Sequence, residues 1–377
     1  MSEVSGPLKG LKVIELARIL AGPWAGQTLA DLGAEVIKVE GPKGDDTRTW
    51  GPPFIERDGD TSAAYYYACN RGKTSVFADF KTDAGRQKVL DLVDSADIVI
   101  ENFKVGTLAK FGLDYESLSK HNPRLIYCSI TGFGQTGPYA QRAGYDFMIQ
   151  GMSGLMSITG EEDGGPQKTG VAISDLVTGL YSGMGILAAV EQRHRTGRGQ
   201  HIDMALFDCS VALLANQTMN YLASGNSPTR LGNAHPNIAP YQTFQTKDGH
   251  INIAVGNDDQ FARCCAVLGL QELPGDERFA TNAARVANRD PLIDHLTQAT
   301  RARLSEDLLS AFEDATVPAG PINTVGEALE DEQIAARGLR IAPEGIPGVR
   351  GPWVFSDARL ETSKTAPKRP KPDDRKS

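Results

Sequence analysis

The sequence has few of the features that mark metal-binding, membrane or secreted proteins. Its five cysteines are odd in number and none are spaced as C-x-x-C; the adjacent pair Cys264 and Cys265 cannot form a standard zinc pair. The six histidines are scattered, so no metal site is predicted. No run reaches the roughly 18 apolar residues of a membrane helix, and residues 1–10 lack the apolar core of a signal peptide. We therefore expect a cytoplasmic chain with reduced thiols.

Charge and composition narrow the class further. The 377 residues carry a formal net charge of −8, with 40% hydrophobic and 23% charged residues. The excess of negative charge makes nucleic acid an unexpected partner, and the composition is typical of a globular protein. The length allows two domains. Only residues 361–377, rich in Lys, Pro and Asp, are predicted to be a disordered tail.

Short apolar strands alternate with helices over the first part of the chain. The predicted strands are 11–16, 35–39, 74–79, 97–101, 124–130 and 201–206, with helices at 24–32, 82–95 and 175–195 and an apolar helix at 207–223. This alternation predicts an α/β fold in which residues 1–224 form the first part of a large Rossmann-like domain with a parallel sheet. Ligands of such sheets collect beyond the carboxyl ends of the strands.

The pattern changes after residue 224. Two alternating strands within 241–255 flank Lys247-Asp-Gly249, which is a strong hairpin signal. Helices are predicted at 258–268, 289–302 and 305–314. Residues 225–324 are therefore expected to form a small α+β domain, and residues 325–360, with a helix at 327–336, to return to the large domain.

Two loops are candidates for ligand contact. Residues 131–137 match G-x-G-x-x-G after a strand, but Pro138 follows, and no good amphipathic helix comes next, so we expect a loop near some ligand rather than a dinucleotide site. Residues 41–64 read as a long loop that carries Arg48, an anion-pairing group, and Trp50, a flat apolar one.

One carboxylate stands alone in residues 170–185. Asp175 lies in an uncharged run of small and apolar residues, and glycines follow at 179, 183 and 185. Aspartate is a favoured helix N-cap, as is the neighbouring Ser174. From the residues alone, Asp175 is either the cap of the following helix or a functional carboxylate that the helix dipole keeps ionised.

Several motifs together resemble one known family. They comprise residues 8–16 with 21–23, 32–40, 70–73, 100–103, 132–134, 174–179 and 196–200. Over about residues 7–360 the chain resembles the class III CoA-transferases, the formyl-CoA transferase and carnitine CoA-transferase group. Residues 253–261 and 320–323 look most like members that use succinyl-CoA and other dicarboxylic acids.

The resemblance implies a fold, a substrate and a mechanism. In this family the large and small domains form a ring, and two rings interlock as a homodimer. An aspartate, here Asp175, is the covalent nucleophile that passes through an acyl anhydride and an aspartyl-CoA thioester. A coenzyme A thioester is thus the substrate, and no tightly bound cofactor or metal is implied.

The resemblance also assigns binding residues. The residues implied for CoA are Ile19, Leu20, Ala78, Lys81, Asn102, Phe103, Thr107, Lys110 and Leu206, and the candidates for substrate are Arg48, Trp50, Tyr145 and His235. The formyl-CoA members carry glutamine at Leu20, arginine at Gly41 and four consecutive glycines in the region of 232–241. Formyl-CoA and oxalate are therefore not the expected substrates.

Two alternative functions remain open at this stage. The related 2-methylacyl-CoA racemases place a histidine at the position of Tyr145, and a tyrosine with a pKa near 10 is a poor base at neutral pH, which favours transfer. The other alternative is a non-catalytic protein that binds CoA.

Overall fold

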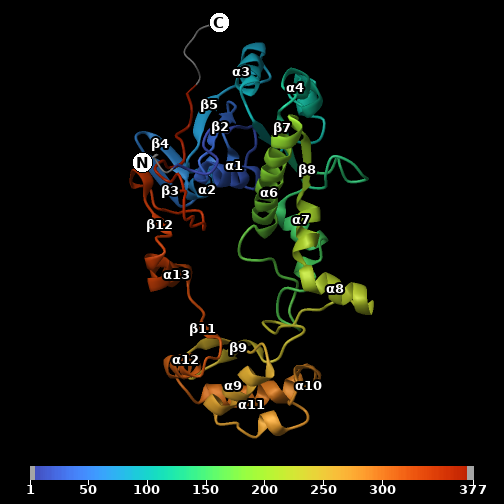
Figure 1. The fold of residues 1–377 in the computed structure, drawn as a ribbon, viewed down its shortest axis with the longest axis vertical. Helices are drawn as coiled ribbons and strands as arrows, with labels where there is room; N and C mark the ends of the chain where they lie inside the picture. Colours follow the sequence, from blue (N-terminus) through green and yellow to red (C-terminus); the bar gives the residue numbers. More distant parts are fainter. Residues whose placement is uncertain (1–4, 372–377) are drawn as a thin grey trace. The chain divides into compact units, whose positions relative to one another are not determined.

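The computed structural model describes residues 5–371. The chain forms two compact units (Figure 1). The large unit comprises residues up to 155, 168–226 and from 332 onward, and the small unit comprises 156–167 and 227–331. Residues 156–167 thus belong to the small unit although they precede the boundary expected at 225.

A six-stranded parallel sheet forms the centre of the large unit, in the order β5-β2-β1-β6-β7-β8. The strands are β1 (Lys12–Glu15), β2 (Glu35–Glu40), β5 (Thr74–Phe77), β6 (Ile98–Glu101), β7 (Ile126–Thr131) and β8 (His201–Ala205). The apolar residues of the four central strands, β2, β1, β6 and β7, are buried on both faces, as in parallel sheets covered by helices. The predicted α/β class with a parallel sheet is confirmed.

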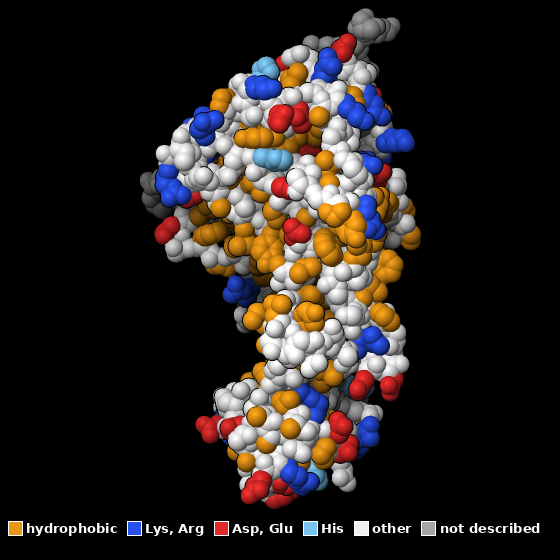
Figure 2. Space-filling model, turned by 90° about the vertical axis from the view of Figure 1, so that its right-hand side faces the viewer, with side chains coloured by type: hydrophobic (Ala, Val, Ile, Leu, Met, Phe, Trp, Pro, Cys, Tyr) orange, Lys and Arg blue, Asp and Glu red, His pale blue; other side chains and the backbone are white. Residues whose placement is uncertain are grey.

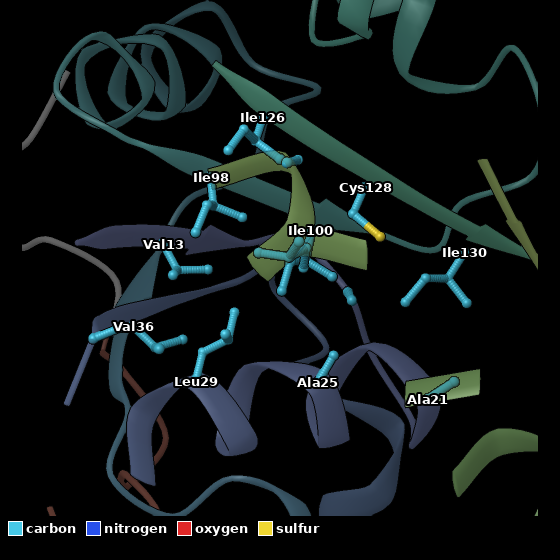
Figure 3. Packing of buried hydrophobic residues seen from close by; sticks show 14 of the residues in the cluster. Val13, Ala21, Ala25, Leu29, Val36, Ile98, Ile100, Ile126, Cys128 and Ile130 are labelled. Atoms are coloured by element: carbon cyan, nitrogen blue, oxygen red, sulfur yellow. The ribbon is translucent and has the colours of Figure 1, made fainter. Parts of the chain in front are cut away.

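Helices cover both faces of this sheet. The helices of the large unit are α1 (Ala21–Asp31), α2 (Ala64–Cys69), α3 (Asp83–Asp94), α4 (Tyr115–His121), α5 (Asp146–Met152), α6 (Ile173–Thr196), α7 (Leu206–Leu213), α8 (Ala215–Ser224) and α14 (Glu332–Ala336). Val13 belongs to the core that contains α1 and α6, whereas the next residue, Ile14, belongs to the core of α3 and α4. Figure 3 shows Ala25 and Leu29 of α1 facing the strand residues of the first core.

Helix α6 packs unusually close to α1. A Cβ atom added to Gly179 would lie 2.7 Å from the backbone oxygen of Ala21, so only glycine fits there. Among the described residues, α6 alone is long and apolar enough to cross a membrane by length and composition. Such a composition also suits a core helix, and the side of α6 that holds Ile186, Ala189 and Val190 is buried in the core with α1.

The segment 41–64, predicted to be a loop, holds regular structure. It contains the 3-10 helix η1 (Asp46–Thr49) and the antiparallel hairpin of β3 (Phe54–Arg57) and β4 (Asp60–Ala63). Asp58 and Gly59 at its tip both have positive φ, at 48° and 79°, as a tight two-residue hairpin turn requires. The Asp-Gly pair was therefore a signal for this hairpin that the loop prediction overlooked.

The helix predicted at 207–223 is two helices. Between α7 and α8 the backbone of Ala215 takes a φ of 44°, a conformation that cannot continue a right-handed helix. Nothing in the apolar pattern of the segment marks this break, because apolar residues continue through both helices.

The end of the chain packs on the large unit. Ala366 is buried against Tyr66 and Tyr67, and Thr365 is buried beside it. The disordered tail predicted from residue 361 is therefore wrong for 361–371, whose few apolar residues are sufficient to anchor it. Residues 372–377 lie outside the described residues.

The small unit is an α+β structure with its own core. Its antiparallel sheet has the order β11-β10-β9, and helices cover it. The elements are β9 (Tyr241–Gln245), β10 (His250–Ala254), β11 (Ala319–Pro321), α9 (Asp258–Leu268), α10 (Asn282–Ala287), α11 (Arg289–Arg301), α12 (Ser305–Asp314) and α13 (Val325–Glu330). The core contains Phe244, Phe261 and both adjacent cysteines, Cys264 and Cys265.

Candidate active site

A cleft of about 240 Å³ opens at the carboxyl edge of the large sheet. Its wall is made by the segments that follow β1, β6 and β7, by the loop 140–146, and by residues from the starts of α6 and α7. The lining residues are Arg18, Ile19, Leu20, Ala21, Asn102, Phe103, Lys104, Val105, Ile130, Thr131, Gly132, Ala140, Arg142, Ala143, Gly144, Tyr145, Asp146, Asp175 and Leu206. This is the edge where parallel sheets bind ligands.

Asp175 lies in the first turn of α6, inside the helix rather than before it. The helix begins at Ile173, its N-cap residue is Ala172, and no side chain of the cap residue bonds to the helix. Of the two alternatives that the residues alone allowed for Asp175, the N-cap is therefore wrong. Its carboxyl group is available to the cleft because it is not used to cap the helix.

The surroundings of Asp175 make its carboxyl group basic. Burial, and after it the negative charge of Asp146, raises the pKa of Asp175 to about 7. The dipole of α6 favours the ionised form, whereas burial and the charge of Asp146 act against it. The expectation that the helix start keeps this group ionised stays a prediction.

The loop after β1 is held in a strained conformation beside the cleft. Ile19 has a φ of 74°, which is costly for a β-branched residue. Asn102 accepts a hydrogen bond from the Arg18 backbone N–H at 3.0 Å and donates one to the Arg18 carbonyl oxygen at 2.6 Å. Asp45 accepts the N–H of Ile19 at 3.3 Å. Two side chains remote in sequence thus fix the shape of this wall.

The structure brings together seven of the residues predicted from the sequence. The cleft is lined by Ile19, Leu20, Asn102, Phe103, Tyr145, Asp175 and Leu206. Ala78, Lys81, Thr107 and Lys110 do not line it, although Phe80 contacts both Phe103 and Phe111 and so connects their neighbourhoods to the cleft wall. The binding of CoA by these four residues stays a prediction.

Arg48 is not directed at the cleft. It is 1% exposed, and its guanidinium donates to Glu40 through Nε at 2.8 Å and Nη2 at 2.7 Å. Further hydrogen bonds join it to Ser62 and Tyr66. This position contradicts the expected role of Arg48 in holding an acceptor acid, because its donors already serve a buried network.

Trp50 is connected to the neighbourhood of the cleft by Tyr65, a residue that the sequence analysis did not single out. The half-exposed indole packs edge-on against the ring of Tyr65 at 5.5 Å. Burial, followed by the charge of Asp175, raises the pKa of Tyr65 to about 12, so the Tyr65 hydroxyl stays protonated as a hydrogen-bond donor. A role for Trp50 in acceptor binding stays a prediction.

The small unit holds the last predicted site residue, His235. Its Nδ1 accepts the N–H of Asn237 at 3.1 Å, and its carbonyl oxygen accepts from Arg289 at 2.8 Å. Because Nδ1 is an acceptor, the neutral ring carries its proton on Nε2. Its role in substrate binding or in covering the active site stays a prediction.

The glycine-rich loop 131–137 serves close packing. A Cβ atom at Gly132 would lie 2.5 Å from the Cα of Gly144, so the two loops of the cleft wall touch backbone to backbone. The residues after Gly137 form turns rather than a helix, so the helix N-terminus that a dinucleotide site uses is absent there. Within residues 5–371, no three His, Cys, Asp or Glu side chains gather as a metal site.

Sequence reasoning missed four charged residues of the cleft: Arg18, Lys104, Arg142 and Asp146. Asp146 directly follows Tyr145 in the Gly-Tyr-Asp element, so its position was in view. Arg142 lies over the rings of Tyr139 and Phe133 at 4.5 and 5.4 Å, a contact that depends on the folded loop and leaves no sequence pattern.

The cleft holds a carboxylate at the start of a helix together with basic side chains, an arrangement that suits a nucleophile acting on an anionic substrate. A model of the CoA-transferase family III matches residues 8–371, and the chain belongs to this family. The succinate–glutarate CoA-transferase of Agrobacterium fabrum is 59% identical over 370 residues, which cover 96% of this chain and 92% of that protein. The human succinyl-CoA:glutarate CoA-transferase is 44% identical and is covered to 83%.

A solved structure shows the same fold. The crystal structure of a CAIB/BAIF family protein from Brucella suis is 63% identical, with a TM-score of 0.88 and 97% of each chain covered. The resemblance to class III CoA-transferases inferred from the sequence is confirmed, and the chain is a CoA-transferase.

Proposed function

We propose that this protein moves CoA from succinyl-CoA to a second dicarboxylic acid, with glutarate as the first acceptor to test. The observation that carries the proposal is Asp175, a half-buried carboxylate that lines the cleft at the strand ends. The relatives that act on succinyl-CoA and glutarate supply the substrate class.

A carboxylate can carry out the whole exchange. Asp175 attacks the thioester carbonyl of succinyl-CoA, which expels CoA thiolate and leaves a succinyl-aspartyl anhydride. The thiolate then attacks the aspartyl carbonyl, so succinate leaves and an aspartyl-CoA thioester forms. Glutarate attacks this thioester, and the released thiolate attacks the glutaryl carbonyl of the new anhydride, which yields glutaryl-CoA and free Asp175. The cycle needs no tightly bound cofactor.

The charges around the cleft support CoA as the substrate. Arg18, Lys104 and Arg142 line the same cleft as Asp175, and basic side chains pair readily with phosphate groups. The cleft walls leave Asp175 only half-exposed to water, which matters because water hydrolyses an anhydride.

The test is CoA exchange between succinyl-CoA and labelled glutarate. We expect Asp175→Ala to abolish exchange, by at least about a thousandfold, because the substitution removes the carboxylate that forms the covalent intermediate. Hydroxylamine added during turnover should mark Asp175 as a hydroxamate detectable by mass spectrometry. Retained turnover in Asp175→Ala contradicts the mechanism, and deuterium uptake at the α-carbon of a 2-methylacyl-CoA indicates a racemase instead.

The proposal includes a homodimer and a cytoplasmic location. Exposed apolar side chains gather on α6, α7 and α8, and Figure 2 shows apolar side chains on the face that carries α7 and α8. Patches of this kind commonly mark a protein interface. The proposal that the two chains of the dimer interlock rests on the family resemblance. Cell fractionation tests the location.

A further inference from the structure

The first turn of α6 is capped by a residue 27 positions before the helix starts. Oδ1 of Asp146, the first residue of α5, accepts the N–H of Ser174 at 2.8 Å and that of Asp175 at 3.4 Å. Ala172, at the N-cap position, offers no acceptor of its own. Asp146 therefore acts as the N-cap of α6 and binds the backbone N–H of the nucleophile itself.

A second side chain fixes the orientation of Asp146. The fully buried Gln150 donates from Nε2 to Oδ2 of Asp146 at 2.8 Å, and its Oε1 accepts the N–H of Thr169 at 3.0 Å. Gln150 lies one turn after Asp146 on α5, and Thr169 lies just before α6. The carboxylate is thus bound on both oxygens and cannot rotate away from α6.

We propose that Asp146 is a positioning residue that fixes the backbone of Asp175 and, through its negative charge, controls the ionisation of the Asp175 carboxyl group. The inference rests on the proposed function of Asp175 as the nucleophile. Asp146 acts through Asp175 and is not itself a group that forms bonds with substrate.

The basic residues of the cleft, Arg18, Lys104 and Arg142, are not among the causes of the pKa shift of Asp175, which leaves Asp146 as the controlling charge. Tyr65 of α2 is neutral, because burial raises its pKa to about 12. Arg18 is engaged with Asp46 at 2.8 Å, and Arg142 lies over aromatic rings. Besides burial, Asp146 is the cause that raises the pKa of Asp175. A more basic carboxylate is a stronger nucleophile, at the cost of a smaller ionised fraction near neutral pH.

The two functions of Asp146 can be separated by substitution. In Asp146→Asn an oxygen remains to accept the α6 N–H groups, while the charge is lost together with the acceptor for Gln150, because an amide nitrogen cannot accept a hydrogen bond. In Asp146→Ala the oxygen and the charge are both lost. The matched control is Asp248→Asn, because Asp248 caps α12 from a distance in the same way, accepting the N–H of Ser305 at 2.8 Å, and lies in the small unit.

The experiment measures kcat/KM for CoA exchange against pH, with hydrogen exchange of residues 173–178 as a readout that does not need activity. We expect Asp146→Asn to keep hydrogen-exchange protection and to move the acidic limb of the profile down by about one pH unit, because a neighbouring negative charge is gone. Asp146→Ala should lose protection at 173–178 and, on the plateau above the acidic limb, about 10- to 100-fold in kcat/KM; its limb should shift as in Asp146→Asn, because the charge is lost there too.

The possible outcomes distinguish a failure of this inference about Asp146 from a failure of the proposed function. An acidic limb at the same pH in Asp146→Asn and wild type overturns the electrostatic role. Equal losses of activity in Asp146→Ala and Asp248→Asn, or unchanged protection at 173–178, overturn the positioning role. Absence of CoA exchange in the wild type contradicts the proposed function instead, and leaves the hydrogen-exchange result to decide whether Asp146 holds the helix start.

Discussion

Burial of Asp175 links the reactivity of the site to the stability of the protein. A carboxylic acid whose pKa is higher in the folded protein than in the unfolded chain binds more protons in the folded state between the two values. For Asp175 the folded value is about 7 and the reference value is 3.8. Its ionisation therefore costs stability progressively as the pH rises through this window, and the cost is complete above it.

We expect Asp175→Asn to be more stable than the wild type above the window and equally stable below it. The amide has the same shape but no charge to bury, so the melting temperature at about pH 8 should rise by a few degrees, with little change near pH 4. Calorimetry of both proteins across pH measures this. A gain in stability that does not depend on pH would contradict the ionisation argument.

Arg48 illustrates a residue whose type was read correctly and whose role was not. An arginine in a glycine- and proline-rich segment predicts anion pairing, and Arg48 does pair with an anion, Glu40. The sequence could not tell a substrate carboxylate from one at the end of β2, because the pairing depends on the hairpin folding back over the sheet edge.

We expect Arg48→Met to destabilise the protein by about 3–5 kcal/mol, because it leaves the carboxylate of Glu40 buried without its partner. Urea unfolding measures this. The control is Arg86→Met, since Arg86 forms an exposed pair with Asp83, for which a loss below about 1 kcal/mol is expected. In the folded fraction of Arg48→Met the KM for the acceptor acid should stay within about twofold of wild type; a large rise would restore the binding role.

At the scale of elements, the strands of the parallel sheet were the most predictable part of the fold. Runs such as Lys12–Glu15 and Ile98–Glu101 are short, mainly apolar and bounded by turns. They are recognisable because a strand that is buried on both faces requires a nearly continuous apolar run. The start of α6 could not be predicted in this way, because its cap, Asp146, comes from another helix. A cap that is distant in sequence leaves no local signature.

The glycines of α6 give a paired test of how this helix meets α1. Alanine favours a helix over glycine by about 1 kcal/mol. At Gly183 the nearest atom to an added Cβ is Cγ2 of Thr28 at 3.8 Å, an ordinary contact, whereas at Gly179 backbone lies at 2.7 Å. We expect Gly183→Ala to stabilise the protein by up to about 1 kcal/mol and Gly179→Ala to destabilise it by about 1–3 kcal/mol.

Thermal and urea unfolding of the two variants decide the matter, since they differ by one turn of the same helix. Gly179→Ala should also lower CoA exchange, because residue 179 lies one turn after Asp175 and a shift of α6 moves the nucleophile. Equal effects of the two substitutions would contradict the close approach of α1 and α6.

At the scale of the whole molecule, the sequence predicted the two kinds of structure better than their limits. Composition and period change after residue 224, and the small α+β unit follows there, from residue 227. Residues 156–167 belong to that unit as well, but they are a short turn-rich segment held by contacts such as that of Arg230 with the carbonyl oxygen of Gly164 at 2.7 Å. Contacts between distant segments are set by the fold and have no periodic signal.

The side of α6 that does not face α1 exposes an apolar stripe, from which we predict a dimer interface. Leu180, Met184 and Leu187 lie at helical spacing and are 44%, 64% and 37% exposed. An apolar stripe on the second side of a core helix is costly in water unless a partner covers it. With the homodimer proposed above, a second copy of this chain is the partner that would bury this stripe.

We expect the wild type to have the mass of two 40.5 kDa chains in light scattering at micromolar concentration. Met184→Glu with Leu187→Glu should give monomers or unfolded protein, because a buried interface cannot hold unpaired carboxylates. The control is Lys247→Glu, a charge change at the exposed tip of the β9–β10 hairpin, which should stay dimeric. A wild type that is monomeric, or a double variant that remains a dimer, contradicts the assignment of this stripe to a dimer interface.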